Sequence, residues 1–124
     1  MCVIQLTSND LIEALVKSIS ELALIDFSRD KNLIEGLHLH LYSALNRLDY
    51  GLQVKNPMVN EIKKMYPYMF DMVIYSLEET KKNYQITIPE EEAAYLTLHF
   101  QASIERLNNN RERKKRTIVV CHMV

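Results

Sequence analysis

Apolar residues recur every three or four positions along most of the chain, with polar residues between them. This spacing, near 100° per residue, places the apolar side chains on one face of an α-helix. The pattern predicts helices near residues 10–23, 29–49, 57–66, 67–84 and 89–107. The residues expected on their inward faces include Leu22, Leu37, Leu48, Met65 and Phe100. With two glycines and three prolines, the chain lacks the turn residues of a β-sandwich. We therefore expect an all-α fold, a compact five-helix bundle.

Turn and cap residues mark several of these boundaries. Gly51 should end the second helix, because glycine readily adopts the left-handed conformation beyond a helix end. Asn56 followed by Pro57 predicts an N-cap and a first helical residue. Tyr66 precedes Pro67, and a residue before proline avoids the helical region. We therefore expect the third helix to break there and the fourth to begin at Pro67.

The composition changes near the C-terminus. Residues 111–116 contain five basic residues in six and predict a solvated linker. Thr117–Cys121 is an apolar, β-branched run typical of a buried strand, without a partner strand in this chain. The predicted organisation is therefore a helical domain over 1–110, a basic linker over 111–116, and the start of another domain over 117–124.

Length and charge exclude several classes of protein. The 124 residues suit one domain, and the net charge of −1 argues against a strongly basic nucleic-acid binder. No apolar run reaches membrane-spanning length, and the first residues do not resemble a secretory signal. Cys2 and Cys121 lie at opposite ends and form no disulfide framework. A reducing cytosol therefore fits the sequence best.

Histidines are the candidate reactive residues. On the second predicted helix, His38 and His40 lie on opposite flanks of the apolar stripe, about 200° apart, so this pair cannot chelate one metal. Gly36 lies one turn before His40, and this small neighbour leaves the imidazole accessible. Arg47 lies seven residues after His40, on the same face, where it could approach an anionic group.

The last predicted helix has its own polar stripe, with His99 at the centre. Glu92 and Arg106 share this face, seven residues before and after the histidine. Two interpretations of His40 and His99 remain open at this point. They could be half-buried residues hydrogen-bonded to backbone or carboxylate groups. Alternatively, they could be neutral imidazole nucleophiles that accept a phosphoryl group and so switch a helix or subunit interface.

Two blocks of the sequence resemble the PTS regulation domain, or PRD, of bacterial sugar-operon regulators. The first is LHLHLYSALNRLDYGLQVKNPMVNEIKKMYPYMF, and the second is IPEEEAAYLTLHF. The signature positions of the first block are His40, Arg47, Asn56, Pro57, Tyr66 and Pro67. Those of the second are Glu92 and His99. The resemblance covers roughly residues 8–107 and leaves His38 outside the pattern.

The resemblance implies a five-helix regulatory domain that forms homodimers, and not an enzyme or a cofactor-binding protein. It implies that His40 and His99 are phosphorylated by the phosphocarrier HPr or a sugar-specific enzyme IIB of the sugar phosphotransferase system. Arg47, Glu92 and Arg106 would support the phosphoryl groups. Phosphorylation would then switch the dimer arrangement and the activity of a cytoplasmic transcriptional activator or antiterminator of sugar-utilisation genes.

The C-terminal segment adds to this interpretation. Thr117–Cys121 resembles the first strand and phosphorylatable cysteine of an enzyme IIB-like domain. The resemblance thus implies that the chain is the last PRD of a DNA-binding activator of the mannitol and lichenan regulator type. Nucleic acid would be bound by a domain missing from this chain, and no contact with a membrane is expected.

Two other classes of function are alternatives. A helical phosphotransfer shuttle would pass the phosphoryl group onward, although two histidines on separate polar faces fit it less well. A metal-binding module could use His40, His99 and Glu92. The regulatory interpretation predicts no metal site, and direct binding of RNA or DNA by this chain is not expected.

Overall fold

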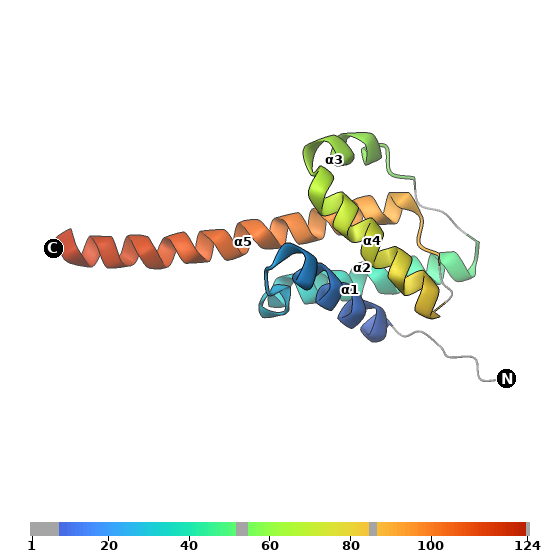
Figure 1. Cartoon of the computed structure of the whole chain (residues 1–124), viewed down its shortest axis with the longest axis horizontal. Helices are drawn as coiled ribbons and strands as arrows, with labels where there is room; N and C mark the ends of the chain where they lie inside the picture. Colours follow the sequence, from blue (N-terminus) through green and yellow to red (C-terminus); the bar gives the residue numbers. More distant parts are fainter. Residues whose placement is uncertain (1–7, 52–54, 85–86, 124) are drawn as a thin grey trace.

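The structure is a computed structural model that describes residues 8–51, 55–84 and 87–123. Its helices are α1 (Ser8–Ala23), α2 (Lys31–Asp49), α3 (Val59–Met65), α4 (Pro67–Tyr84) and α5 (Glu90–Met123). A short 3₁₀ helix, η1 (Phe27–Arg29), lies between α1 and α2 (Figure 1). The described residues contain no strand. The all-α, five-helix prediction is therefore confirmed.

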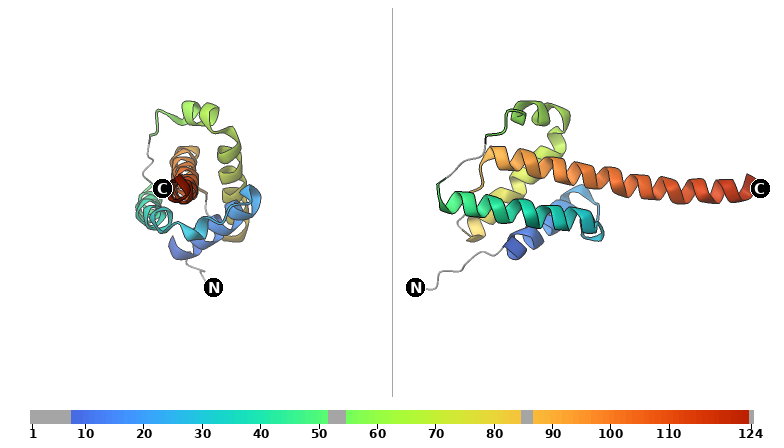
Figure 2. Two further views of the ribbon diagram at one scale, coloured as in Figure 1. Left: turned by 90° about the vertical axis from the view of Figure 1, so that its left-hand side faces the viewer. Right: turned by 180° about the vertical axis from the view of Figure 1, so that it is seen from behind.

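Helix α5 is packed at its beginning and free of the bundle at its end. Its first part contacts α2, α3 and α4, while α1 packs against α2 and α4 on the other side of the core. The right-hand view of Figure 2 shows α2 and the first part of α5 running alongside each other, and the two helices are in contact. The later part of α5 projects away from the other helices (Figures 1 and 2). The α2–α5 contact is where the predicted site residues of the two helices meet.

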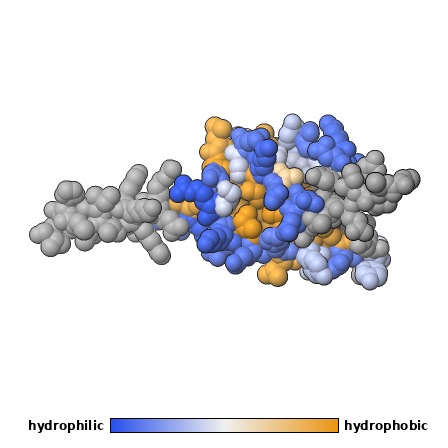
Figure 3. Space-filling view, turned by 90° about the horizontal axis from the view of Figure 1, so that it is seen from below, coloured by the Kyte–Doolittle hydropathy of each residue, from blue (hydrophilic) through white to orange (hydrophobic). Residues whose placement is uncertain are grey.

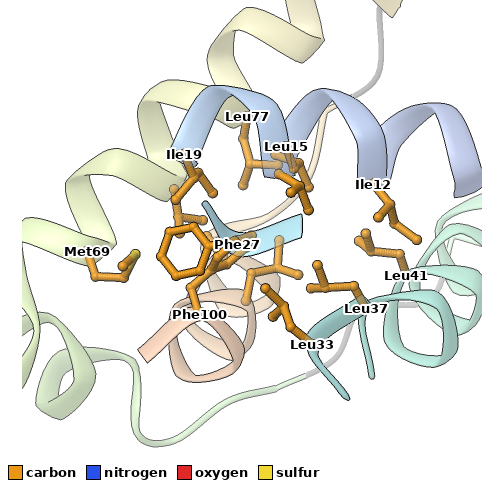
Figure 4. Packing of buried hydrophobic residues seen from close by; sticks show 14 of the residues in the cluster. Ile12, Leu15, Ile19, Phe27, Leu33, Leu37, Leu41, Met69, Leu77 and Phe100 are labelled. Carbon is orange, nitrogen blue, oxygen red and sulfur yellow. The ribbon is translucent and has the colours of Figure 1, made fainter. Parts of the chain in front are cut away.

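The core consists of the apolar faces that the sequence pattern predicted. Phe27 of η1 fills its centre and meets Phe100 edge to face, with ring centroids 5.1 Å apart (Figure 4). Removing side chains of this size from water stabilises the fold by roughly 1.5–3 kcal/mol each. The fully buried aliphatic residues around them include Leu11, Leu15, Ile19, Leu33, Leu37, Leu41, Val73 and Leu96.

Two residues that were expected on these apolar faces are exposed. Leu22 is 45% exposed and Met65 is 63% exposed, so the prediction was wrong for both. Each lies in the last turn of its helix, where the side chain faces solvent. Leu48, another predicted core residue, has a side chain outside the described residues.

The segment around Asn56 differs in part from the prediction. The break at Tyr66 and the start of α4 at Pro67 are confirmed. Asn56, however, is not the N-cap, because α3 begins at Val59. Its Oδ1 instead accepts a hydrogen bond of 3.0 Å from the Met58 amide, which closes a turn before the helix. Asn56 Nδ2 also donates to the Glu91 carbonyl at 3.4 Å and so links this turn to the start of α5.

The end of α5 was also predicted wrongly. The helix continues to Met123 instead of ending near Leu107, and the backbone of the expected strand at 117–121 is helical. The basic residues of 111–116 favour a helix, and a single strand would leave its backbone N–H and C=O groups unpaired. The assignment of residues 117–124 to a following domain remains a prediction.

Candidate functional site

Helices α2 and α5 bring the two candidate histidines into contact. The ring centroids of His40 and His99 lie 5.5 Å apart, with an interplanar angle of 61°. Tyr95, one turn before His99, places its ring 5.4 Å from that of His40. Both histidines are half-buried. The sequence predicted two separate polar faces, and the structure shows that these faces form one site.

A buried carboxylate connects the two helices at this site. Glu92 is almost fully buried, and its Oε2 is hydrogen-bonded to His40 Nε2 at 2.6 Å. Arg47 Nη2 donates to the other oxygen, Oε1, at 2.9 Å. A buried carboxylate without partners would be strongly destabilising, and these two contacts offset that cost. Glu92 was expected beside His99 on α5, whereas its partners are both on α2.

Gly36 has a different role from the one that its position suggested. A Cβ atom at this residue would lie 3.2 Å from both Nδ1 and Cε1 of His99. This distance is shorter than almost all ordinary Cβ contacts. The missing side chain therefore makes room for His99 of the opposite helix, a role that the position of Gly36 beside His40 did not suggest.

Arg106 pairs with a residue that the sequence analysis missed. Its Nε and Nη2 both lie 2.9 Å from Asp30 Oδ2 and donate to it. Asp30 is buried, and its Oδ1 accepts a hydrogen bond from the Asn32 amide in the first turn of α2. An aspartate directly before a helix is a recognisable N-cap, but nothing in the sequence connects it with a residue 76 positions away.

The ionisation of two groups follows from these surroundings. Burial lowers the pKa of His99, and the charges of His40 and Arg106 lower it further. His99 is therefore held in its neutral form near pH 7. Burial alone raises the pKa of Asp30, but the nearby Ser103 hydroxyl, the Arg106 guanidinium with its charge, and the Leu33 amide outweigh it. The net result is a pKa below the ordinary value of 3.8.

His38 lies apart from this site. It lines a surface groove between α1, η1 and α2, together with Ile12, Val16 and Ile34. The surface seen from below shows hydrophobic patches among hydrophilic residues (Figure 3). The position of His38 agrees with the expected separation of the two flanks of α2 and provides a histidine outside the site for comparison.

Within residues 8–51, 55–84 and 87–123, no group of three histidine, cysteine or acidic side chains is placed to hold a metal ion. No helix in this part of the chain combines the length and apolar character needed to span a membrane.

Comparison with known proteins identifies the family. Residues 13–103 match the family model of the PRD domain, and the chain therefore belongs to the PRD family. It is 53% identical over 109 residues to the transcriptional regulator ManR of Bacillus subtilis. The aligned region covers 88% of this chain and 17% of ManR. It is 37% identical over 114 residues to the probable licABCH operon regulator of the same species, covering 92% of this chain and 18% of that protein.

A third relative is the protein GlcT of Staphylococcus epidermidis, 28% identical over 108 residues, with 85% of this chain and 38% of GlcT covered. The chain thus spans less than a fifth of the length of ManR and of the licABCH operon regulator. No solved structure matches it significantly.

Proposed function

We propose that this domain is a phosphorylation-controlled module of a regulator of sugar-utilisation genes. Its His40 and His99 accept phosphoryl groups from the sugar phosphotransferase system, through the phosphocarrier HPr, a sugar-specific enzyme IIB, or both. The observation that carries this proposal is the contact between the two signature histidines, 5.5 Å apart, beside the guanidinium of Arg47. The family and the names of ManR and the licABCH operon regulator support it.

The electrostatics of the site suit a switch. A neutral imidazole is the nucleophile in phosphoryl transfer, and burial favours the neutral form of His99. A phosphoryl group adds about 1.5–2 negative charges. Beside Glu92 this negative charge repels the buried carboxylate. It also attracts the Arg47 guanidinium, which pairs with that carboxylate in the unphosphorylated domain. Phosphorylation thereby draws Arg47 away from Glu92, changes the contacts between α2 and α5, and shifts the balance between two helix or dimer arrangements.

The remaining parts of the proposal concern the whole protein. We place it in the cytoplasm as a homodimer, and we assign nucleic-acid binding to parts of a longer regulator outside this chain. In this role the domain is a regulatory module, not an enzyme. A histidine phosphotransfer shuttle is the alternative, and it differs in passing the phosphoryl group onward.

Phosphorylation of the purified domain tests the proposal. The domain is incubated with phosphoenolpyruvate, enzyme I and HPr, with and without a sugar-specific enzyme IIB. Modified residues are then mapped by mass spectrometry under alkaline conditions that preserve phosphohistidine. We expect label on His40 and His99, and loss of each label in His40→Ala and His99→Ala.

His38→Ala is the matched control, because His38 lies on the same helix but outside the site. Label on neither His40 nor His99 with either donor would contradict the proposal. Transfer of the label to an aspartate acceptor protein would favour the shuttle.

A further inference from the structure

The contact between His40 and Glu92 determines which ring nitrogen carries the hydrogen. Nε2 of His40 lies 2.6 Å from Glu92 Oε2, and the Arg47 guanidinium donates to the other carboxylate oxygen. A carboxylate paired with a guanidinium is ionised, and an ionised carboxylate only accepts hydrogen bonds. Nε2 must therefore be the donor, and in the neutral ring Nδ1 then carries the free lone pair.

We infer that Glu92 is a positioning residue that makes Nδ1 of His40 the atom that accepts the phosphoryl group. The inference rests on the proposed function, because it specifies the chemistry of the same site. Glu92 suits this role because it is itself fixed, buried on α5 and held by Arg47. It touches the nitrogen that does not react and acts through the orientation of the ring.

The transfer step balances without movement of a proton. The Nδ1 lone pair attacks the phosphorus, and the bond between phosphorus and the donor atom breaks, with the electron pair leaving on that donor atom. His40 keeps its hydrogen on Nε2, so the phosphorylated ring carries a positive charge. That charge develops directly against the Glu92 carboxylate, which stabilises it.

The alternative acceptor, Nε2, is disfavoured by the same contact. A phosphoryl group on Nε2 would have to displace the carboxylate that lies 2.6 Å away. It would also place its negative charges against a buried negative group, and like charges repel strongly where water is excluded. The unphosphorylated site is therefore arranged for reaction at Nδ1.

Nuclear magnetic resonance of the ¹⁵N-labelled domain tests the inference. Two-bond ¹H–¹⁵N correlations give the tautomer of His40 before phosphorylation, and ¹⁵N–³¹P couplings give the phosphorylated nitrogen after treatment with phosphoenolpyruvate, enzyme I and HPr. We expect hydrogen on Nε2 and phosphorus on Nδ1. Hydrogen on Nδ1, or phosphorus on Nε2, would overturn the inference.

A Glu92→Gln variant makes the test specific. The glutamine amide can accept from Arg47 through its oxygen and donate to His40 Nε2 through its nitrogen. We therefore expect the hydrogen to move to Nδ1 and phosphorylation of His40 to fall sharply, because Nδ1 then lacks a free lone pair and the glutamine amide still covers Nε2. Glu105→Gln is the matched control, with the same loss of charge at an exposed position of α5, and it should behave as the wild type.

The outcomes separate the two proposals. If His40 is phosphorylated on Nε2, the inference fails while the proposed function stands. If His40 is not phosphorylated by either donor, its assignment as an acceptor fails, and the tautomer alone shows whether Glu92 orients the ring. If Glu92→Gln does not fold, as judged by circular dichroism, the tautomer and the phosphorylated nitrogen of the wild type still decide the question.

Discussion

Glu92 shows how one buried side chain determines the arrangement of its neighbours. Its two oxygens take different partners, His40 and Arg47, which lie on one face of α2 seven residues apart. Neither partner is on the helix that carries Glu92. The contact therefore sets the orientation of the His40 ring and the position of α2 against α5 at the same time.

Removal of Arg47 should destabilise the domain. In Arg47→Ala, one oxygen of the buried Glu92 carboxylate loses its charged partner. We expect the free energy of unfolding to fall by about 1–3 kcal/mol. Denaturant titration followed by circular dichroism measures this change. Lys82→Ala is the control, since Lys82 forms an exposed pair with Glu79 and should cost less than about 1 kcal/mol. Equal effects of the two substitutions would contradict the expectation.

The lowered pKa of His99 predicts a dependence of stability on pH. Burial, with the charges of His40 and Arg106, holds this pKa below its ordinary value of 6.5. The unfolded chain then binds a proton more readily than the folded one, so the free energy of unfolding falls as pH falls below about 6.5. We expect His99→Gln to reduce this decrease, measured by denaturant titration between about pH 5 and 8. His38→Gln is the comparison, and an unchanged pH profile in His99→Gln would refute the argument.

At the scale of elements, close approach of α2 and α5 depends on Gly36. Helix interiors rarely favour glycine, because its backbone is too flexible. Here the absence of Cβ leaves space for the His99 ring, which lies only 3.2 Å from the position that a Cβ would occupy. The two helices can therefore bring His40 and His99 into ring contact, which a larger residue at this position would hinder.

A Gly36→Ala substitution should shift the His99 ring. Alanine improves helix propensity by about 0.5–1 kcal/mol, but the new Cβ presses on a ring that is packed against His40. We expect a gain in stability smaller than this range, or a loss, together with changed His99 resonances. Gly51→Ala is the comparison, because its φ of 69° makes alanine strained while nothing lies within 4 Å. A full gain in stability with unchanged His99 resonances would argue against this close contact.

Asp30 holds the start of α2 against α5. An Asp30→Asn variant retains a side chain suited to capping the helix but loses the ionic contact with Arg106. We expect a loss of about 1–2 kcal/mol at neutral pH. The difference should shrink as pH falls through 3.8 and below, because the lowered pKa of Asp30 stabilises the wild type only while this carboxyl is ionised.

Chemical unfolding at a series of pH values measures this effect. Combination with Arg106→Gln should add little further loss, because both substitutions remove the same contact. Fully additive losses would show that the two residues act independently.

For the whole molecule, the centre of the core lies at the short helix between α1 and α2. Phe27 of η1 is fully buried against Phe100 of α5. Phe27→Ala should therefore cost about 3–5 kcal/mol, measured as a lower denaturant midpoint. Tyr68→Ala, at an exposed position, should change stability little. A small effect at Phe27 would mean that η1 contributes less to the core than its burial indicates.

The sequence predicted the helices better than their contacts. Periodicity identifies the buried face of each helix, so Leu37 and Phe100 were predicted correctly as inward-facing. It cannot show which helix will cover that face. Glu92 and Arg106 were therefore assigned to His99, their neighbour in sequence, while their partners lie on or just before α2. The end of α5 was missed because β-branched residues favour strands only where a partner strand exists.

Helix α5 carries the candidate site near its beginning, and its far end projects away from the other helices (Figure 1). At 1.5 Å per residue, the 34 residues of Glu90–Met123 form a rod about 51 Å long. The arm beyond Leu107 is about 24 Å, so each degree of tilt moves its tip by about 0.4 Å. A reorientation of a few degrees between α2 and α5 barely changes the distance between His40 and His99. The same reorientation displaces the far end of the helix by about 1–2 Å, which makes that end the place where a label would detect a change between α2 and α5 most sensitively.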